Sequence, residues 1–305
     1  MPPGKSVAAL VALLAVAAAL VAVLLSGRGP APPSPVAGAA PLGPSRGVAS
    51  RDAAAARPAP LPAPPVALRG AAARRARIPI LMYHVIAPVP PGAARPDLWV
   101  APARFRRQMR ALAAAGYHAI TLRRAYDAWT RGAGLPRRPV VVSFDDGSLS
   151  HSIHAAPVLR ALGWPGVLNL ALDHVGRGGI TAPRVRRLIA DGWEVDSHTL
   201  THVDLTTVGP RRLRRELRGS RRELRRRFGV PADFLCYPSG RFDPAIAAAA
   251  AAAGYRAATT TVPGYADRRD LFALRRVRVE GAETARALLA ELATGRASVR
   301  PSSAG

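Results

Sequence analysis

The chain has 305 residues, a net charge of +25 from 44 Lys and Arg against 19 Asp and Glu, and a single cysteine, Cys236. One cysteine excludes an intramolecular disulfide and also a zinc site built from cysteines. The part of the chain that begins at residue 77 is long enough to fold as one well-cored domain of barrel size.

The first 28 residues have the pattern of a targeting segment. Lys5 precedes an uninterrupted apolar run over residues 7–25. At about 1.5 Å per residue this run nearly spans a hydrocarbon core of roughly 30 Å, and it is longer than the apolar region of most signal peptides. We therefore predict a signal anchor over 1–28 that holds the protein on the extracytoplasmic side of a membrane. The alternative is a signal peptide cleaved near Ala37-Gly38-Ala39, which would release a secreted protein.

Residues 29–76 are mostly Pro, Ala, Gly and Arg, with few large apolar side chains. Such a segment cannot bury enough surface to offset its chain entropy, so it is predicted to be a disordered, extended linker. The folded domain is expected over residues 77–296, with a disordered tail over 297–305.

From residue 77 onward the pattern alternates between strands and helices. Strands are predicted near residues 78–83, 118–122, 140–142, 166–172, 193–196, 234–237, 256–261 and 272–279, and helices near 102–116, 126–129, 153–162, 181–191, 211–227, 244–253 and 283–292. Seven or so strands that alternate with helices indicate a parallel sheet, and at this length a (β/α) barrel is the favoured fold.

The predicted helix over 211–227 contains ten arginines and only two acids, Glu216 and Glu223. Its apolar residues fall on one helical face, which is typical of a surface helix with a solvated basic side. A stretch of this kind often indicates nucleic-acid binding. We predict no nucleic-acid partner, because the chain is expected to be exported and shows no base-reading module. An anionic envelope polymer or lipid headgroup fits better, and a merely solvated face is an equal alternative.

The first motif is the strand Val140-Val141-Val142-Ser143-Phe144 and the residues Asp145-Asp146-Gly147 that end it. Adjacent residues at a strand end point in different directions, so the two carboxylates can have different roles. One can bind a metal while its neighbour faces a substrate. The alternative is an ordinary turn, since Asp-Gly is a common turn dipeptide.

The second motif is Ser197-His198-Thr199-Leu200-Thr201-His202. Two histidines four residues apart meet on one face of a helical turn and can share a metal. Together with Asp146 they offer one carboxylate and two imidazoles, which leaves coordination positions open as a catalytic site requires. A divalent metal is therefore expected, with zinc favoured for these ligands and other metals left open. The alternative is a polar loop with coincidental histidines.

The third motif contains Pro238-Ser239-Gly240, a turn that follows the predicted strand ending at Tyr237. Such a turn can aim the Ser239 backbone N–H at an anion and so form an oxyanion hole, although the same residues also form ordinary turns. His84 directly follows the first strand. Because barrel enzymes place their chemistry where strands end, these positions on different strands indicate one common site.

In their order and spacing, the three motifs together resemble the polysaccharide deacetylases, the fourth family of carbohydrate esterases, over roughly residues 78–295. The resemblance implies a distorted (β/α) barrel that hydrolyses N-acetyl groups on a glycan. It implies that Asp145 is the general base on a metal-bound water and that Ser239 contributes to catalysis. The metal ligands that it implies are Asp146, His198 and His202.

The chain departs from the usual family pattern in two places. Many members supply the general acid from a Leu-x-His motif near the C-terminus, but no histidine follows His202 here, and Cys236 stands where the third motif usually has arginine. Both features resemble the branch that acts on exported poly-N-acetylglucosamine, whose members carry a Tyr-His pair at the first strand. That likeness implies that His84, after Tyr83, is the general acid. The alternative is that His84 only orients Asp145.

The expected function is therefore metal-dependent removal of N-acetyl groups from an envelope or extracellular glycan that contains N-acetylglucosamine. One alternative is a catalytically impaired glycan-binding domain on the same fold. Another is a different metal-dependent hydrolase, such as a phosphoesterase, because the arginine excess would suit an anionic substrate. The expected partners are the N-acetylated polysaccharide and, through the N-terminal helix, a membrane; no protein partner is predicted.

Overall fold

The computed structural model describes residues 65–176 and 178–295. The predicted segment 1–28, most of the predicted linker and the tail 297–305 lie outside these residues. Within the described ranges, no helix combines the length and the apolar character that a membrane span requires.

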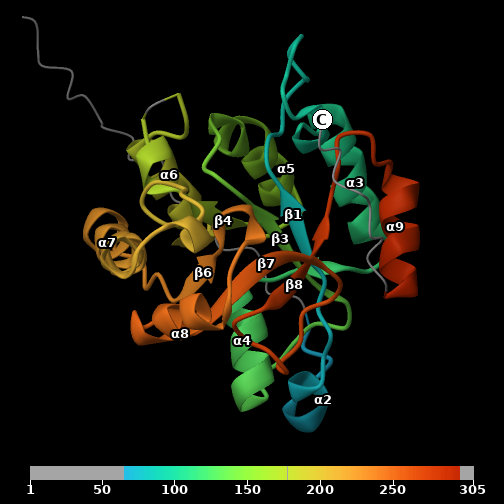
Figure 1. Cartoon of the computed structure of the whole chain (residues 1–305). Helices are drawn as coiled ribbons and strands as arrows, with labels where there is room; N and C mark the ends of the chain where they lie inside the picture. The colour runs from blue at the N-terminus through green and yellow to red at the C-terminus, as the bar shows by residue number, and fades with distance from the viewer. Residues whose placement is uncertain (1–64, 177, 296–305) are drawn as a thin grey trace, which may run out of the picture. The chain divides into compact units, whose positions relative to one another are not determined.

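The described residues form one parallel sheet that closes into a barrel (Figure 1). Its strands are β1 (Ile80–Tyr83), β2 (His118–Ala119), β3 (Pro139–Phe144), β4 (Val167–Leu170), β5 (Glu194–Ser197), β6 (Phe234–Cys236), β7 (Ala257–Pro263) and β8 (Leu274–Arg278). The order is β1-β8-β7-β6-β5-β4-β3-β2, and β1 also pairs with β3, so seven strands close the ring and β2 lies beside β3. The predicted (β/α) barrel of about seven strands is confirmed.

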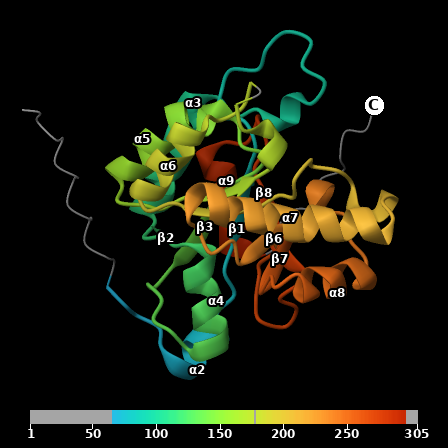
Figure 2. The same ribbon diagram turned by 90° about the vertical axis from the view of Figure 1, so that its left-hand side faces the viewer.

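Helices surround the strands (Figures 1 and 2). They are α2 (Gly70–Arg74), α3 (Pro102–Ala114), α4 (Leu122–Arg131), α5 (Ala156–Ala161), α6 (Ala182–Ala190), α7 (Pro210–Phe228), α8 (Pro244–Ala252) and α9 (Ala285–Thr294). Several begin at a side-chain cap. Asp243 accepts a hydrogen bond of 2.7 Å from the backbone N–H of Ile246 at the start of α8.

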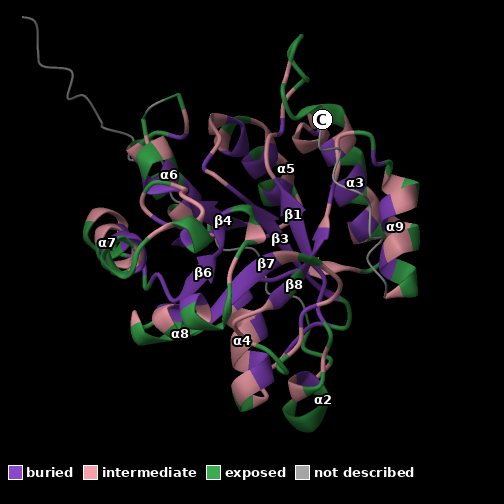
Figure 3. Cartoon of the chain, in the orientation of Figure 1, coloured by how far each residue is buried: buried purple, intermediate pink, exposed green. Residues whose placement is uncertain are grey.

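Alternate residues of most strands pack into different apolar cores, as the two-residue period of a strand requires. Val140 and Val142 of β3 pack against the outer helices, whereas Val141 belongs to a core that includes Trp129 of α4. The backbone N–H of Arg123 in α4 donates to Glu194, the first residue of β5. Helix α4 therefore covers the amino ends of the strands, and the opposite edge remains for polar groups. Figure 3 shows the strands as the most buried part of the molecule.

The structure differs from the sequence-based boundaries in two places. Leu68 pairs with Leu135, and Ala73 in α2 is fully buried, so the last residues of the predicted linker pack within the folded unit. Burial of these apolar side chains offsets the entropy that ordering this short stretch costs. The strand predicted over 118–122 is only two residues long, because Thr121 caps α4 by accepting a hydrogen bond from the backbone N–H of Arg124.

Candidate active site

The site residues predicted from the sequence lie after the carboxyl ends of four strands. His84 follows β1, Asp145 and Asp146 follow β3, His198 follows β5, and Ser239 comes shortly after β6. Because all strand pairs are parallel, these positions share one edge of the barrel.

Three donor atoms converge at this edge. Asp146 Oδ1 lies 3.4 Å from His198 Nε2 and 3.2 Å from His202 Nε2, and the two Nε2 atoms are 3.1 Å apart. Ligands about 2.1 Å from one tetrahedral cation are separated by ~3.4 Å. The Nδ1–H of His198 donates to the carbonyl oxygen of Cys236 at 2.7 Å, which leaves the Nε2 lone pair facing the other two donors. The three residues therefore fit a divalent cation.

The histidine pair does not lie on a helical turn, so that detail of the prediction is wrong. His198 and His202 instead belong to a loop in which two residues have left-handed backbone angles. Four of the five non-glycine residues with positive φ in the described ranges are at this edge: Asp146 (72°), Thr199 (68°), His202 (56°) and Ser239 (54°). Each such residue costs roughly 1–2 kcal/mol, and strain of this kind is concentrated at functional sites.

Glu216 of α7 holds the loop between the two histidines. Its carboxylate accepts hydrogen bonds from the backbone N–H of Leu200 (2.9 Å) and from both the backbone N–H (3.1 Å) and the hydroxyl (2.8 Å) of Thr201. The Glu216 side chain is 3% exposed. The helix predicted over 211–227 is confirmed. Of its two acids, Glu216 both supports the histidine loop and lies near Arg212.

Replacing Glu216 with alanine is expected to weaken divalent cation binding about tenfold or more. The substitution leaves two backbone N–H groups and a hydroxyl without their acceptor, and loss of such supporting contacts typically costs 10- to 100-fold in metal affinity. Metal titration by calorimetry measures the effect. Glu223→Ala is the matched control, because Glu223 is on the same helix and pairs with the exposed Arg226. Equal affinity of Glu216→Ala and wild type would contradict the assigned role.

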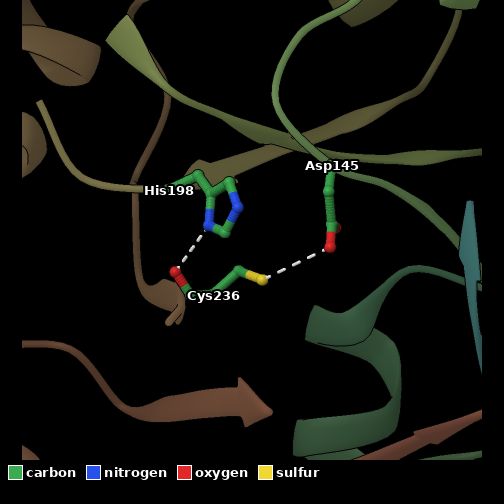
Figure 4. Close-up of side chains that lie close together, drawn as sticks. All are labelled: Asp145, His198 and Cys236. Atoms are coloured by element: carbon green, nitrogen blue, oxygen red, sulfur yellow. Dashed lines mark hydrogen bonds between the residues drawn. The ribbon is translucent and has the colours of Figure 1, made fainter. Parts of the chain in front are cut away.

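Asp145 is a buried carboxylate whose two oxygens have different surroundings. Oδ1 accepts hydrogen bonds from Asn169 Nδ2 (2.7 Å) and Arg276 Nη1 (2.8 Å). Oδ2 lies 3.8 Å from both His84 Nε2 and Cys236 Sγ. Figure 4 shows Cys236 between Asp145 and His198. Its thiol forms a hydrogen bond with Asp145, and its backbone carbonyl accepts a hydrogen bond from His198.

The charge state of Asp145 depends on its ion pair with Arg276. Burial by itself raises the pKa of Asp145, but the positive charge of Arg276 and the neighbouring histidines hold it well below its usual range. The side chains of Asp145 and Arg276 are 2% and 1% exposed. Asp145 is therefore ionised at neutral pH and able to accept a proton.

Arg276 is the site residue that sequence reasoning missed. Cys236 occupies the position where the family usually has an arginine, and its sulfur does face Asp145, but the cation comes from β8 instead. Arg276 Nε also donates to the Thr260 carbonyl oxygen at 2.7 Å. The sequence signal that could have identified Arg276 was the alternation of residues in β8. Leu274 and Arg276 share the inner face of this strand, and an arginine on that face requires a buried acceptor.

His84 lies beside Asp145, with its Nε2 atom 3.8 Å from Asp145 Oδ2. Burial lowers the pKa of His84, and the negative charges of Asp145 and Asp146 offset this only in part. Its backbone carbonyl is hydrogen bonded to Nε2 of the buried His151. His174 Nδ1 similarly lies 2.9 Å from the carbonyl oxygen of Asp146. These two histidines thus hold the backbone of the loops that carry the site residues.

Comparisons with known proteins agree with this arrangement. Residues 132–258 match the family model described as polysaccharide deacetylase. YxkH of Bacillus subtilis (strain 168), a protein assigned to the polysaccharide deacetylases, is 29% identical over 206 residues, which cover 67% of this chain and 72% of that protein. The Streptococcus pyogenes deacetylase PplD in complex with acetate superposes with a TM-score of 0.67 at 26% identity, covering 71% of this chain and 98% of that one. BC0361, a polysaccharide deacetylase from Bacillus cereus, has a TM-score of 0.64 at 28% identity, covering 72% and 69% of the two chains.

A buried, ionised aspartate beside a converging carboxylate and histidine pair, at the carboxyl edge of a parallel barrel, defines a hydrolase of the (β/α)-barrel class. Residues 132–258 thus carry a polysaccharide deacetylase domain, and the similarities above support a polysaccharide de-N-acetylase.

Proposed function

We propose that this deacetylase is metal-dependent and removes N-acetyl groups from an envelope or extracellular glycan that contains N-acetylglucosamine. The observation that carries the proposal is the ionised Asp145 directly beside the three converging donors of Asp146, His198 and His202. The Tyr83-His84 pair and Cys236 support the likeness to the branch acting on poly-N-acetylglucosamine.

Asp146, His198 and His202 would hold the cation, and we propose zinc because two imidazoles and one carboxylate suit it. When bound, the cation supplies polarisation of the acetyl carbonyl and a lowered pKa for the attacking water.

Asp145 takes a proton from the water that attacks the acetyl carbon. Its Oδ1 is held by Arg276 and Asn169, which leaves Oδ2 as the accepting atom. The backbone N–H of Ser239 is proposed to stabilise the developing oxyanion. Ser239 is exposed, and its turn is held by a 2.8 Å hydrogen bond from the Gly240 N–H to the Tyr237 carbonyl.

His84 completes the proton path as the general acid. Its Nε2 is 3.8 Å from Asp145 Oδ2, and its lowered pKa keeps the resting imidazole neutral. The proton that Asp145 removes from water passes to His84 and then to the sugar nitrogen as the C–N bond breaks. One proton leaves the water and one arrives on the amine, so the step balances.

Replacing His84 with glutamine is expected to lower acetate release from the glycan about 100-fold or more, the typical contribution of a general acid. Hydrolysis of an aryl acetate should stay within a few-fold of wild type, because a phenolate leaving group needs no proton. Comparing kcat/KM on the two substrates therefore separates the two roles of His84. If His84 only orients Asp145, both activities fall together.

The test of the proposed function is acetate release by the full chain from N-acetylglucosamine oligomers, before and after chelation. We expect chelation to abolish acetate release and added Zn²⁺ to restore it, with metal content measured in parallel. Glycan binding without acetate release would instead support a non-catalytic domain. Phosphate release from an aryl phosphate, with no acetate from any glycan, would indicate a phosphoesterase.

We also propose that the deacetylase domain works outside the cytoplasm, anchored through residues 1–28. The apolar run over 7–25 supports this. Recovery of the protein in the soluble fraction of the cell interior would contradict it.

A further inference from the structure

Strand β8 places two arginines on the face that lines the barrel. Leu274 belongs to the inner core and Arg276 bonds to Asp145, whereas Val277 belongs to the outer core. Arg278 has the same parity as Arg276 and is the last residue of β8. It therefore faces the edge of the barrel where the active site lies.

The pairing with β1 places Arg278 next to the active site. Arg278 is in register with Met82, and the Val279 N–H donates to the Met82 carbonyl at 3.1 Å. His84 comes two residues after Met82, directly after the end of β1, so it continues the face of β1 on which Met82 lies. Arg278 is also one of the charges that lower the pKa of His84.

Arg278 is half-buried, and its Nη1 atom is buried without a hydrogen-bond partner among the described residues. The neighbouring Arg276 differs, because its Nε and Nη1 both donate to protein oxygens. Burial lowers the pKa of Arg278 and the positive charges of Arg276 and Arg95 lower it further, whereas the carboxylates of Asp97 and Glu280 offset this only in part. Arg278 is thus a partly desolvated cation with one N–H donor group that has no acceptor among the described residues. It lies at the edge of the barrel that carries the active site.

The chemistry of guanidinium defines the missing ligand. It has five N–H donors and no acceptor, and its planar fork matches a carboxylate. The nearby Asp97 is already bonded twice by Arg95, at 2.9 and 2.7 Å. The net charge of +25 would also draw an anionic polymer towards the protein.

We propose that Arg278 binds a carboxylate on the sugar next to the one being deacetylated, so that the substrate is an acidic N-acetylated glycan. This inference rests on the proposed function and narrows its substrate class.

The experiment compares two substrates that differ only in charge. One is an oligomer that alternates N-acetylglucosamine with N-acetylmuramic acid, whose lactyl group carries a carboxylate, and the other is its methyl ester. Acetate release from both is measured for full-length wild type, Arg278→Gln and Arg278→Lys. Arg275→Gln is the matched control, since Arg275 is the exposed outward-facing arginine of β8 and bonds the Pro263 carbonyl.

We expect Arg278→Gln to lower kcat/KM on the acidic oligomer about 10- to 100-fold, the range of a hydrogen-bonded charged pair, chiefly through KM. Activity on the ester should change less than about threefold, the scatter of a surface substitution. Arg278→Lys should retain part of the preference, and Arg275→Gln should resemble wild type. Equal effects of Arg278→Gln on acid and ester, or no effect on either, would overturn the inference.

Measuring the binding of the same two oligomers by calorimetry tests the role of Arg278 independently of the proposed catalytic function. Preferential binding of the acid that depends on Arg278, without acetate release, would support the inference and refute the proposed function. Acetate release with no charge preference in rate or binding would refute the inference alone.

Discussion

Replacing Asp145 with asparagine is expected to lower acetate release by about 1,000-fold or more, within the upper range for loss of a general base. The amide cannot accept the proton of the attacking water. Its carbonyl oxygen can still accept the hydrogen bonds of Asn169 and Arg276, so the loop should keep its position, although loss of the buried ion pair should lower the unfolding temperature. Acetate release at saturating glycan measures the effect, and metal content should equal that of wild type.

Asp146→Asn provides the comparison. It removes a charge from the donor triad, so it should lower the metal content as well as the activity, whereas Asp145→Asn should lower the activity alone. An Asp145→Asn protein with more than about a tenth of wild-type activity would contradict the assignment, because a general base contributes at least about 100-fold.

Replacing Arg276 with glutamine is expected to reduce activity at pH 7 by about 100-fold and to move the acid limb of the pH profile to higher pH. Arg276 holds the pKa of Asp145 below its usual range, while burial acts to raise it. Without the cation the burial effect dominates, and Asp145 becomes protonated at a higher pH. The carboxylate that the mechanism needs is then lost over a wider range of acidic pH.

The same substitution should destabilise the protein, because breaking a buried ion pair typically costs about 3–5 kcal/mol. Thermal unfolding measures this loss, and the pH profile is read well below the unfolding temperature. Arg276→Lys is the companion variant, since it keeps the charge without the fork and should shift the acid limb less. A folded Arg276→Gln protein with the wild-type acid limb would show that the pairing does not control Asp145.

Much of the fold could be predicted because it follows from local patterns. The β-branched run over 140–142 and the helical spacing of Leu213, Leu217 and Leu224 each specify an element by its own periodicity, and the structure contains both. Alternation of strands and helices then indicated a parallel barrel, and parallel strands gather their carboxyl ends at one edge. For this reason the sequence predicts one common site for four residues that follow strands: His84, Asp145, Asp146 and His198.

The sequence by itself therefore determined the class of fold, the edge that carries the chemistry and the donors that converge there. Tertiary structure alone decided what holds them in place. Arg276 binds Asp145, which is 131 residues away in the sequence. Glu216 supports the histidine loop from a helix whose sequence predicts a solvated basic surface. No local pattern contains these pairings, because they form only when the barrel closes and buries a charge that then requires a partner.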